Sequence, residues 1–144
     1  LVHPAPGAGQ ATTSCEDVRP SSPFETLLLC AQQGHAFAQV NLGFMYATGE
    51  GVPEDDAEAV RWYRLAADQG YASAQFNLGV MYDNGEGVPE DLVLAYMWLN
   101  LSAAQGYENA QAGKELIVPD MTREQIAEAQ RMSREWLEAH PSGN

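Results

Sequence analysis

Residues 34–69 read GHAFAQVNLGFMYATGEGVPEDDAEAVRWYRLAADQ, and residues 70–105 read GYASAQFNLGVMYDNGEGVPEDLVLAYMWLNLSAAQ. The two stretches align without a gap, and 21 of their 36 positions are identical. Self-similarity at a fixed period of this length is typical of helical-repeat proteins, in which each unit buries its apolar face against its neighbours. The sequence therefore predicts an all-α superhelix, a solenoid of helix-turn-helix repeats.

Each copy is expected to form two helices. In the first helix, Ala38 and Leu42 belong to an apolar set at helical spacing, and the Gly-Glu-Gly segment that follows ends it. Pro53 is expected in the first turn of the second helix, where its missing N–H costs nothing and the neighbouring acids favour the helix dipole. That helix is predicted to run to about Gln69 and to end at Gly70 in a left-handed conformation.

Shorter matches flank the two full copies. Residues 24–33 resemble the second half of a copy, and residues 106–120 begin a third copy that lacks the Gly-x-Gly-Val-Pro turn. Thr122 and Gln125 have the spacing of a capping box, which opens an amphipathic helix suited to close the array. The sequence thus divides into a flexible N-terminal arm (1–23), a repeat array (24–120), a C-terminal capping helix (121–139) and a tail (140–144).

The charge balance limits the class of partner. The chain has 20 acidic and 7 basic residues, for a formal net charge of −13. A nucleic-acid backbone or an anionic membrane surface would repel most of such a molecule. Nucleic-acid binding is therefore not expected. No apolar run approaches the roughly 18 residues of a membrane span, so membrane insertion is not expected either.

Cys15 and Cys30 are the only cysteines, and their spacing matches no zinc site. Two interpretations remain open, a disulfide that pins the arm to the first helix, or two separate thiols. A disulfide would place the protein in the periplasm or outside the cell, and separate thiols would allow the cytoplasm. The chain begins at Leu1, so we expect a preceding segment to have been removed, whether a secretory signal or not.

The motif Ala-x-Ala-Gln-x-x-Leu-Gly-x-x-Tyr-x-x-Gly-x-Gly-Val, followed by Asp, Ala, Trp-Tyr and Ala-Ala-x-x-Gly, resembles the Sel1-like repeat of bacterial proteins over residues 24–115. The resemblance implies a fold similar to tetratricopeptide repeats and the function of an adaptor in protein assemblies. A cysteine-rich branch of this family is linked to penicillin-like compounds and has a disulfide in every repeat. The full repeats of this chain contain no cysteine, which argues against that branch.

Tetratricopeptide geometry implies that the first helix of each copy lines a concave groove. Carried over by position, the groove residues are Phe37, Val40, Phe44 and Ala47 in the first copy and Ser73, Phe76, Val80 and Asp83 in the second, with Asn41 and Asn77 at the groove edge. These lining positions differ between the copies, as a surface outside the core permits. The alternatives are that the three phenylalanines pack under the chain's own ends and that the two asparagines are structural.

The leading hypothesis is a protein-interaction scaffold that holds a peptide or protein in this groove. The alternatives are a penicillin-binding or weakly β-lactam-hydrolysing protein, and a module that self-associates into a homodimer. His3, His35 and His140 have no partner at metal-ligand spacing, and the glycine-rich turns carry acids that would repel phosphate. We therefore expect no catalytic residue, no metal and no cofactor.

Overall fold

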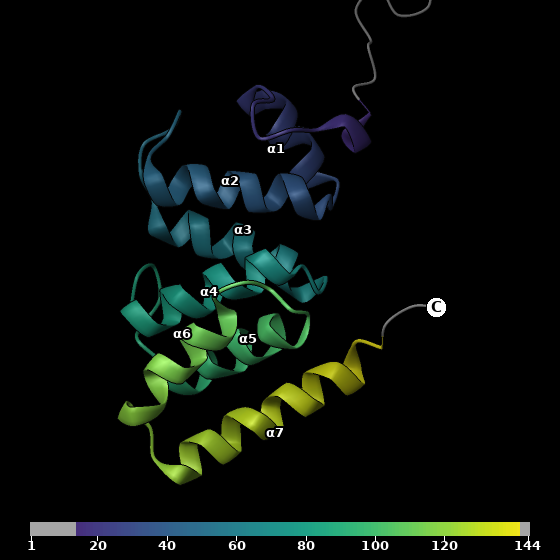
Figure 1. The fold of residues 1–144 in the computed structure, drawn as a ribbon. Coiled ribbons are helices and arrows are strands. Elements are labelled where there is room, and N and C mark those ends of the chain that lie inside the picture. The colour runs from purple at the N-terminus through teal and green to yellow at the C-terminus, as the bar shows by residue number, and fades with distance from the viewer. Residues whose placement is uncertain (1–13, 142–144) are drawn as a thin grey trace, which may run out of the picture.

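A computed structural model describes residues 14–141, which form seven α-helices, two 3-10 helices and no β-strand. The α-helices are α1 (Phe24–Gln32), α2 (Ala36–Thr48), α3 (Asp56–Asp68), α4 (Ala72–Asn84), α5 (Leu92–Ala104), α6 (Ala110–Ile117) and α7 (Arg123–Ala139), and the 3-10 helices are η1 (Cys15–Asp17) and η2 (Val118–Asp120). Helices α1 to α5 stack in sequence order, and both α6 and α7 pack on α5 (Figure 1). The predicted all-α solenoid is confirmed.

The ends of the helices follow local capping chemistry. The Asp55 carboxylate accepts a hydrogen bond from the Glu58 amide at 3.1 Å, so α3 begins at residue 56. The expectation that Pro53 lies in the first helical turn is wrong, because the aspartate N-cap places it three residues before the helix. Gly49 and Gly70, with φ of 75° and 86°, end α2 and α3 in the left-handed conformation as predicted.

A glutamine inside the second copy joins it to the first. Gln75 is fully buried, and its Nε2 donates to the carbonyl oxygen of Ala67, at the end of the preceding helix, at 3.2 Å. From the end of the same copy, Gln105 Nε2 donates to the Gly70 carbonyl at 2.8 Å and to Gln75 Oε1 at 2.9 Å. One buried amide is therefore bonded to the helix before it and to the helix after it.

The same bonds recur 36 residues earlier. Gln39 donates to the Ala31 carbonyl, and Gln69 donates to the Gly34 carbonyl and to Gln39. We call these contacts of Gln39, Gln69, Gln75 and Gln105 the glutamine ladder. The ladder stops at Gln111, which has the same register in the third copy but is exposed and bonded to Glu115.

The N-terminal end of the array is closed by a short segment that was expected to be flexible. Val18 is only 8% exposed and lies in an apolar cluster with Leu27 and Trp62. Cys15 is joined to Cys30 of α1 by a disulfide. Residues 14–22 are therefore docked on the array, while residues 1–13 of the expected arm lie outside the described residues.

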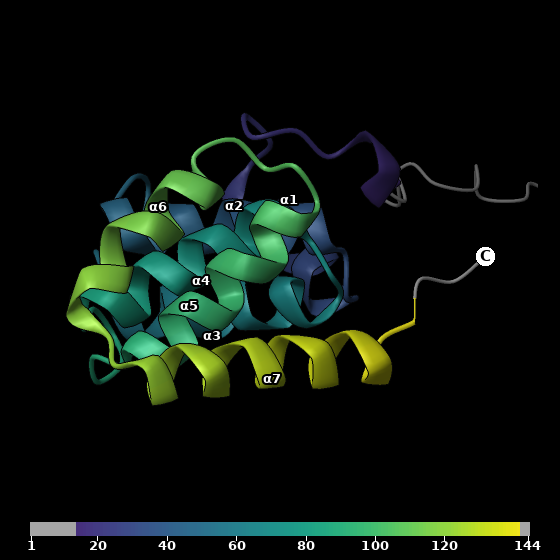
Figure 2. The same cartoon turned by 60° about the horizontal axis from the view of Figure 1, so that its bottom comes forward.

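The C-terminal end departs from the repeat. Asn109 has a positive φ of 73°, and α6 begins at Ala110, two residues later than the registers of α2 and α4 indicate. Both α6 and α7 pack on α5, and Figure 2 shows them on opposite sides of it, so they do not form the helix pair of a third copy. The capping box predicted at Thr122 and Gln125 is present at the start of α7.

Within residues 14–141, no helix is both long and apolar enough to cross a membrane.

We expect Gln75→Leu to lower the free energy of unfolding by about 1–3 kcal/mol, because it removes buried hydrogen bonds to Ala67 and from Gln105. Urea unfolding followed by far-UV circular dichroism measures the change. Gln111→Leu is the matched control and should change stability by less than about 0.5 kcal/mol, since Gln111 is exposed. Equal losses in the two variants would show that the ladder does not stabilise the array.

Candidate binding cleft

A shallow cleft of about 230 Å³ lies between the C-terminal half of α2 and the middle of α4. It is lined by Phe44, Ala47, Thr48, Tyr63, Phe76, Asn77, Val80, Met81 and Glu86. Most of these side chains are apolar and come from the first helices of the two full copies. The cleft therefore brings together five of the residues predicted for the groove: Phe44, Ala47, Phe76, Asn77 and Val80.

Tyr63 reaches this cleft from the second helix because α2 and α3 approach closely. A Cβ atom on Gly43 would come within 2.6 Å of the Tyr63 ring, so only glycine leaves room for it. In the second copy, Gly79 makes the same close approach to Leu99. The two copies share this close approach of their helices, and it places Tyr63 beside Gly43 in the first copy and Leu99 beside Gly79 in the second.

The three phenylalanines of the predicted groove have different surroundings. Phe44 is 48% exposed and lies at the mouth of the cleft. Phe76 also lines the cleft, but its ring packs against Tyr107 with the ring centroids 5.3 Å apart. Phe37 packs on the cluster around Val18, outside the cleft. Phe37 therefore does not line this cleft, because it packs beside the N-terminal segment, and its role in partner binding stays a prediction.

The remaining predicted residues divide in the same way. Asn77 and Val80 line the cleft, whereas Val40 packs on the main core. The Asn41 side chain donates to the Phe37 carbonyl at 2.8 Å, as the structural alternative required. Ser73 is half-buried and does not line the cleft. Asp83 does not line it either.

Asp83 instead lies close enough to Asp120 of η2 for the two negative charges to interact. Burial raises the pKa of its carboxyl, and the negative charge of Asp120 in η2 raises it further. The Asp83 charge therefore acts on Asp120, near the C-terminal end of the repeat array. Asp83 does not line the cleft, and α6, whose path the repeat does not specify, contacts α4, so the role of Asp83 in partner binding stays a prediction.

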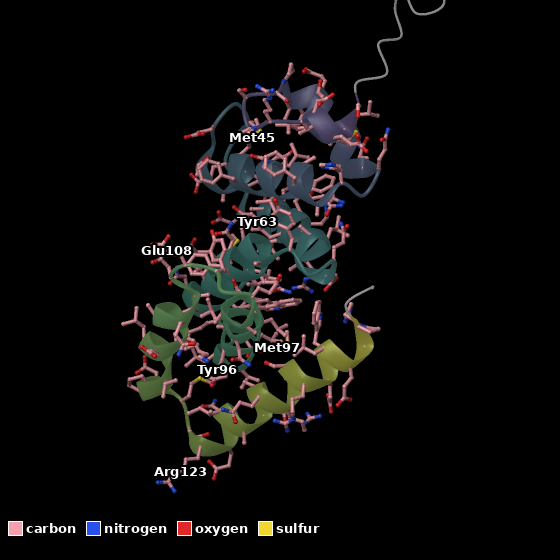
Figure 3. The ribbon with its side chains drawn as sticks, turned by 45° about the vertical axis from the view of Figure 1, so that its right-hand side comes forward. Met45, Tyr63, Tyr96, Met97, Glu108 and Arg123 are labelled. Carbon is pink, nitrogen blue, oxygen red and sulfur yellow. A yellow bond between two sulfur atoms is a disulfide. The ribbon has the colours of Figure 1, made fainter. Side chains whose placement is uncertain are left out.

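The cleft is neutral at its floor and acidic at its edge. Burial raises the pKa of Tyr63 to about 12, and the nearby Tyr107 hydroxyl adds to the rise, so the phenol keeps its proton at neutral pH. Figure 3 shows Tyr63 and Glu108, the neighbour of Tyr107, on the same side of the stack. Glu86 supplies a carboxylate at the edge. None of the lining residues is Ser, Cys, His or Lys, and the polar side chains of the lining are those of Thr48, Tyr63, Asn77 and Glu86.

Four lining residues did not emerge from the sequence: Thr48, Tyr63, Met81 and Glu86. A signal for Tyr63 was present, because it differs from its counterpart Leu99 while the glycines beside them are identical. Tetratricopeptide geometry assigns the groove to the first helices alone, so a residue of the second helix was not expected there. Met81 and Glu86 are identical to Met45 and Glu50 of the first copy, so a difference between the copies could not have identified them as cleft residues.

The fold and the cleft define the class of protein: a helical-repeat solenoid with a partly open concave face. The model of the Sel1 repeat family matches residues 36–71 and 72–107, which together are half of the chain. The chain therefore belongs to the Sel1 repeat family. No curated protein matches the sequence.

Two solved structures are similar. A protective antigen present in uropathogenic Escherichia coli strains, which displays an SLR fold, has 30% sequence identity and a TM-score of 0.78 over 81% of this chain. This chain spans about a quarter of that protein, 25% of its length. A Sel1 repeat protein from Oxalobacter formigenes has 42% identity and a TM-score of 0.62, over 63% of this chain and 68% of that one.

The Sel1-repeat fold is generally a protein-interaction scaffold, and its family is typically non-enzymatic. In this chain, the described residues contain no group of three or more His, Cys, Asp or Glu side chains placed to hold a metal ion. What the cleft offers is apolar surface with a few polar groups around it. Such a surface binds another molecule by burial of apolar area and hydrogen bonding.

We expect Gly43→Ala to destabilise the protein by up to about 2 kcal/mol. Forcing a methyl group against the Tyr63 ring costs about 1–3 kcal/mol, and the better helix propensity of alanine returns about 1 kcal/mol of it. Chemical denaturation measures the difference.

Gly113→Ala is the matched control in α6, where the nearest atom to a new Cβ is 3.5 Å away. It should be neutral or stabilise by up to about 1 kcal/mol. The close-approach interpretation fails if the two substitutions change stability in the same direction.

Proposed function

We propose that the protein is an interaction scaffold that binds an apolar segment of a partner protein in the cleft between α2 and α4. The observation that carries this proposal is Phe44, a large aromatic side chain that is half exposed at the mouth of an apolar cleft. Phe37 and Phe76 are packed against the protein's own side chains. Phe44 is the phenylalanine of the predicted groove whose ring remains available to a partner.

The size of the cleft favours a peptide side chain over a free small molecule. Its volume of about 230 Å³ is smaller than the roughly 300–1,000 Å³ of most small-molecule sites. A partner would insert one or two apolar side chains between Phe44 and Val80, with its backbone along the polar edge formed by Thr48 and Asn77. Recognition of this kind depends on a few apolar anchors surrounded by polar contacts.

The other two functions considered for the sequence have no comparable support. The one disulfide joins η1 to α1 and lies outside the full repeats, unlike the pattern of the penicillin-linked branch. The cleft lining contains no serine, the nucleophile of class A β-lactamases. The exposed surface of Phe44 alone does not favour a homodimer over a partner of another kind.

Phe44→Asp should weaken peptide binding at least tenfold, because it places a charge where an apolar anchor would be buried. A phage-displayed peptide library selected on the wild-type protein provides ligands, and fluorescence anisotropy of the enriched peptides gives their dissociation constants. Apolar residues should be enriched in the selected peptides.

Leu116→Asp is the control, since Leu116 is 77% exposed on α6 and does not line the cleft. It should leave peptide affinity within about twofold of wild type. The proposal is wrong if Phe44→Asp binds the peptides as tightly as wild type, or if Leu116→Asp weakens binding to the same extent. Thermal melting of both variants checks that the fold persists.

We further propose that the protein works in an oxidising compartment, the periplasm or the cell exterior. The support is the Cys15–Cys30 disulfide, which fastens Val18 over the first helix pair. A reduced chain would keep this segment in place by apolar contacts alone.

Thiol titration of the protein isolated under alkylating conditions, then denatured without reductant, should therefore find no free thiol. Reduction should lower the free energy of unfolding by about 3 kcal/mol, the loop-closure contribution for a separation of 15 residues. The chain has no other cysteine, so the effect of a reductant reports on this bridge alone. Two free thiols in the native protein would contradict the proposal.

A further inference from the structure

A second and larger cleft lies at the opposite edge of the array from the Gly-Glu-Gly turns. Its volume is about 560 Å³. It is lined by Asp68, Gln69, Gly70, Gln75, Leu101, Ala104, Gln105, Trp136, Leu137, His140 and Pro141. The turn between α3 and α4 forms one wall, the end of α5 the floor, and the end of α7 the other wall. In Figure 1 the C-terminal end of α7 lies on the same edge as the α3–α4 turn.

Three helices end at this cleft. Asp68 is the last residue of α3, Ala104 is the last residue of α5, and His140 caps α7. The carbonyl end of a helix carries about half a negative charge. Neither α3 nor α5 has a basic residue in its last turn to balance this charge, while at the end of α7 His140 Nδ1 lies 2.8 Å from the Trp136 carbonyl oxygen. Only α4 begins here, so the net field of the helix ends favours a cation.

Asp68 adds a full charge to this field. Among residues 14–141 the three ion pairs lie elsewhere, between Arg61 and Glu58 and from Arg131 to two glutamates, so Asp68 has no ion-pair partner. Partial burial raises the pKa of its carboxyl, and the charges of Arg64 and His140 offset part of this rise. Arg64 is itself engaged, since its guanidinium donates to the Tyr82 hydroxyl. A cation in the cleft would give the Asp68 carboxylate a partner.

The other walls are suited to an alkyl chain. The Trp136 and His140 rings stack with centroids 4.0 Å apart and an interplanar angle of 10°, and the edge of Trp136 packs against Trp98. Leu101 lies at the floor, and Leu137 is 51% exposed at the wall. Arginine and lysine side chains bury an apolar stem and present a charge at its tip, which matches apolar walls that lead to a carboxylate.

We propose that this cleft binds a basic side chain, arginine or lysine, of a partner polypeptide. The cationic group lies between the Asp68 carboxylate and the carbonyl ends of α3 and α5, and the stem lies along Leu101 and Leu137. The site is independent of the cleft at Phe44, because it is built by α7 and by the turn between the two full copies. A partner could therefore be held by an apolar anchor at one site and a basic anchor at the other.

Titration with blocked single amino acids tests the chemistry on the intact chain. The probes are Nα-acetyl-arginine amide and Nα-acetyl-lysine amide, each compared with a neutral analogue of similar length, the citrulline and norleucine derivatives. Proton–nitrogen NMR spectra follow the indole N–H of Trp136, which is buried and has no hydrogen-bond partner among the described residues. The indole of Trp62, in the N-terminal cluster, is the internal reference.

A cationic probe should shift the Trp136 and His140 resonances in a saturable way, with a dissociation constant in the millimolar range, and leave Trp62 unchanged. The neutral analogues should bind at least tenfold more weakly. The arginine and lysine arms show which cation the cleft prefers. The proposal is overturned if citrulline binds as well as arginine, or if no saturable shift occurs with either cation.

Asp68→Asn should weaken binding of the arginine probe about tenfold, because it removes the one carboxylate in the cleft. Asp120→Asn makes the same change of charge in η2, outside the cleft, and should leave the affinity within twofold of wild type. Equal weakening by both variants would mean that the overall charge of −13 attracts the cation. The proposal of a basic side-chain site at Asp68 would then be wrong. The comparison of arginine with citrulline on the wild-type protein decides the question if Asp68→Asn alters the fold.

Discussion

The glutamine ladder is the constraint on which the rest of the structure depends. A buried amide must find partners for both its donor and its acceptor, or its burial costs more than it contributes. Gln75 meets this condition only if the helix before it and the helix after it are held at fixed distances. The ladder therefore sets the spacing of successive helices, and its end at Gln111 coincides with the loss of the repeat geometry at α6.

Within this spacing, glycine decides how closely the two helices of a copy approach. Gly43 admits the ring of Tyr63, and Gly79 admits Leu99. The same backbone arrangement thus presents different side chains in the two copies. This is how a repeat that is uniform in its core produces a cleft that is specific to one place, between Phe44 on α2 and Val80 on α4.

The two clefts arise from different parts of the chain. The cleft at Phe44 comes from positions that vary between the copies, and its surface is largely apolar. The cleft at Asp68 comes from the docking of α7 against α5, and it gathers the carbonyl ends of three helices. One surface suits apolar side chains and the other suits cationic ones, so a single partner segment with both kinds of residue could contact opposite edges of the array.

The sequence by itself determined the repeat, the helices, their glycine-based ends and the capping box of α7, because these depend on contacts within a few residues or on an exact period. It also identified the face that carries Phe44, Phe76 and Val80. Only the tertiary structure decided that Phe37 packs in the N-terminal cluster, that the charges of Asp83 and Asp120 interact, and that α7 packs on α5. These outcomes depend on how the two ends of the chain fold back on the array, and the repeat ends before it can specify either one.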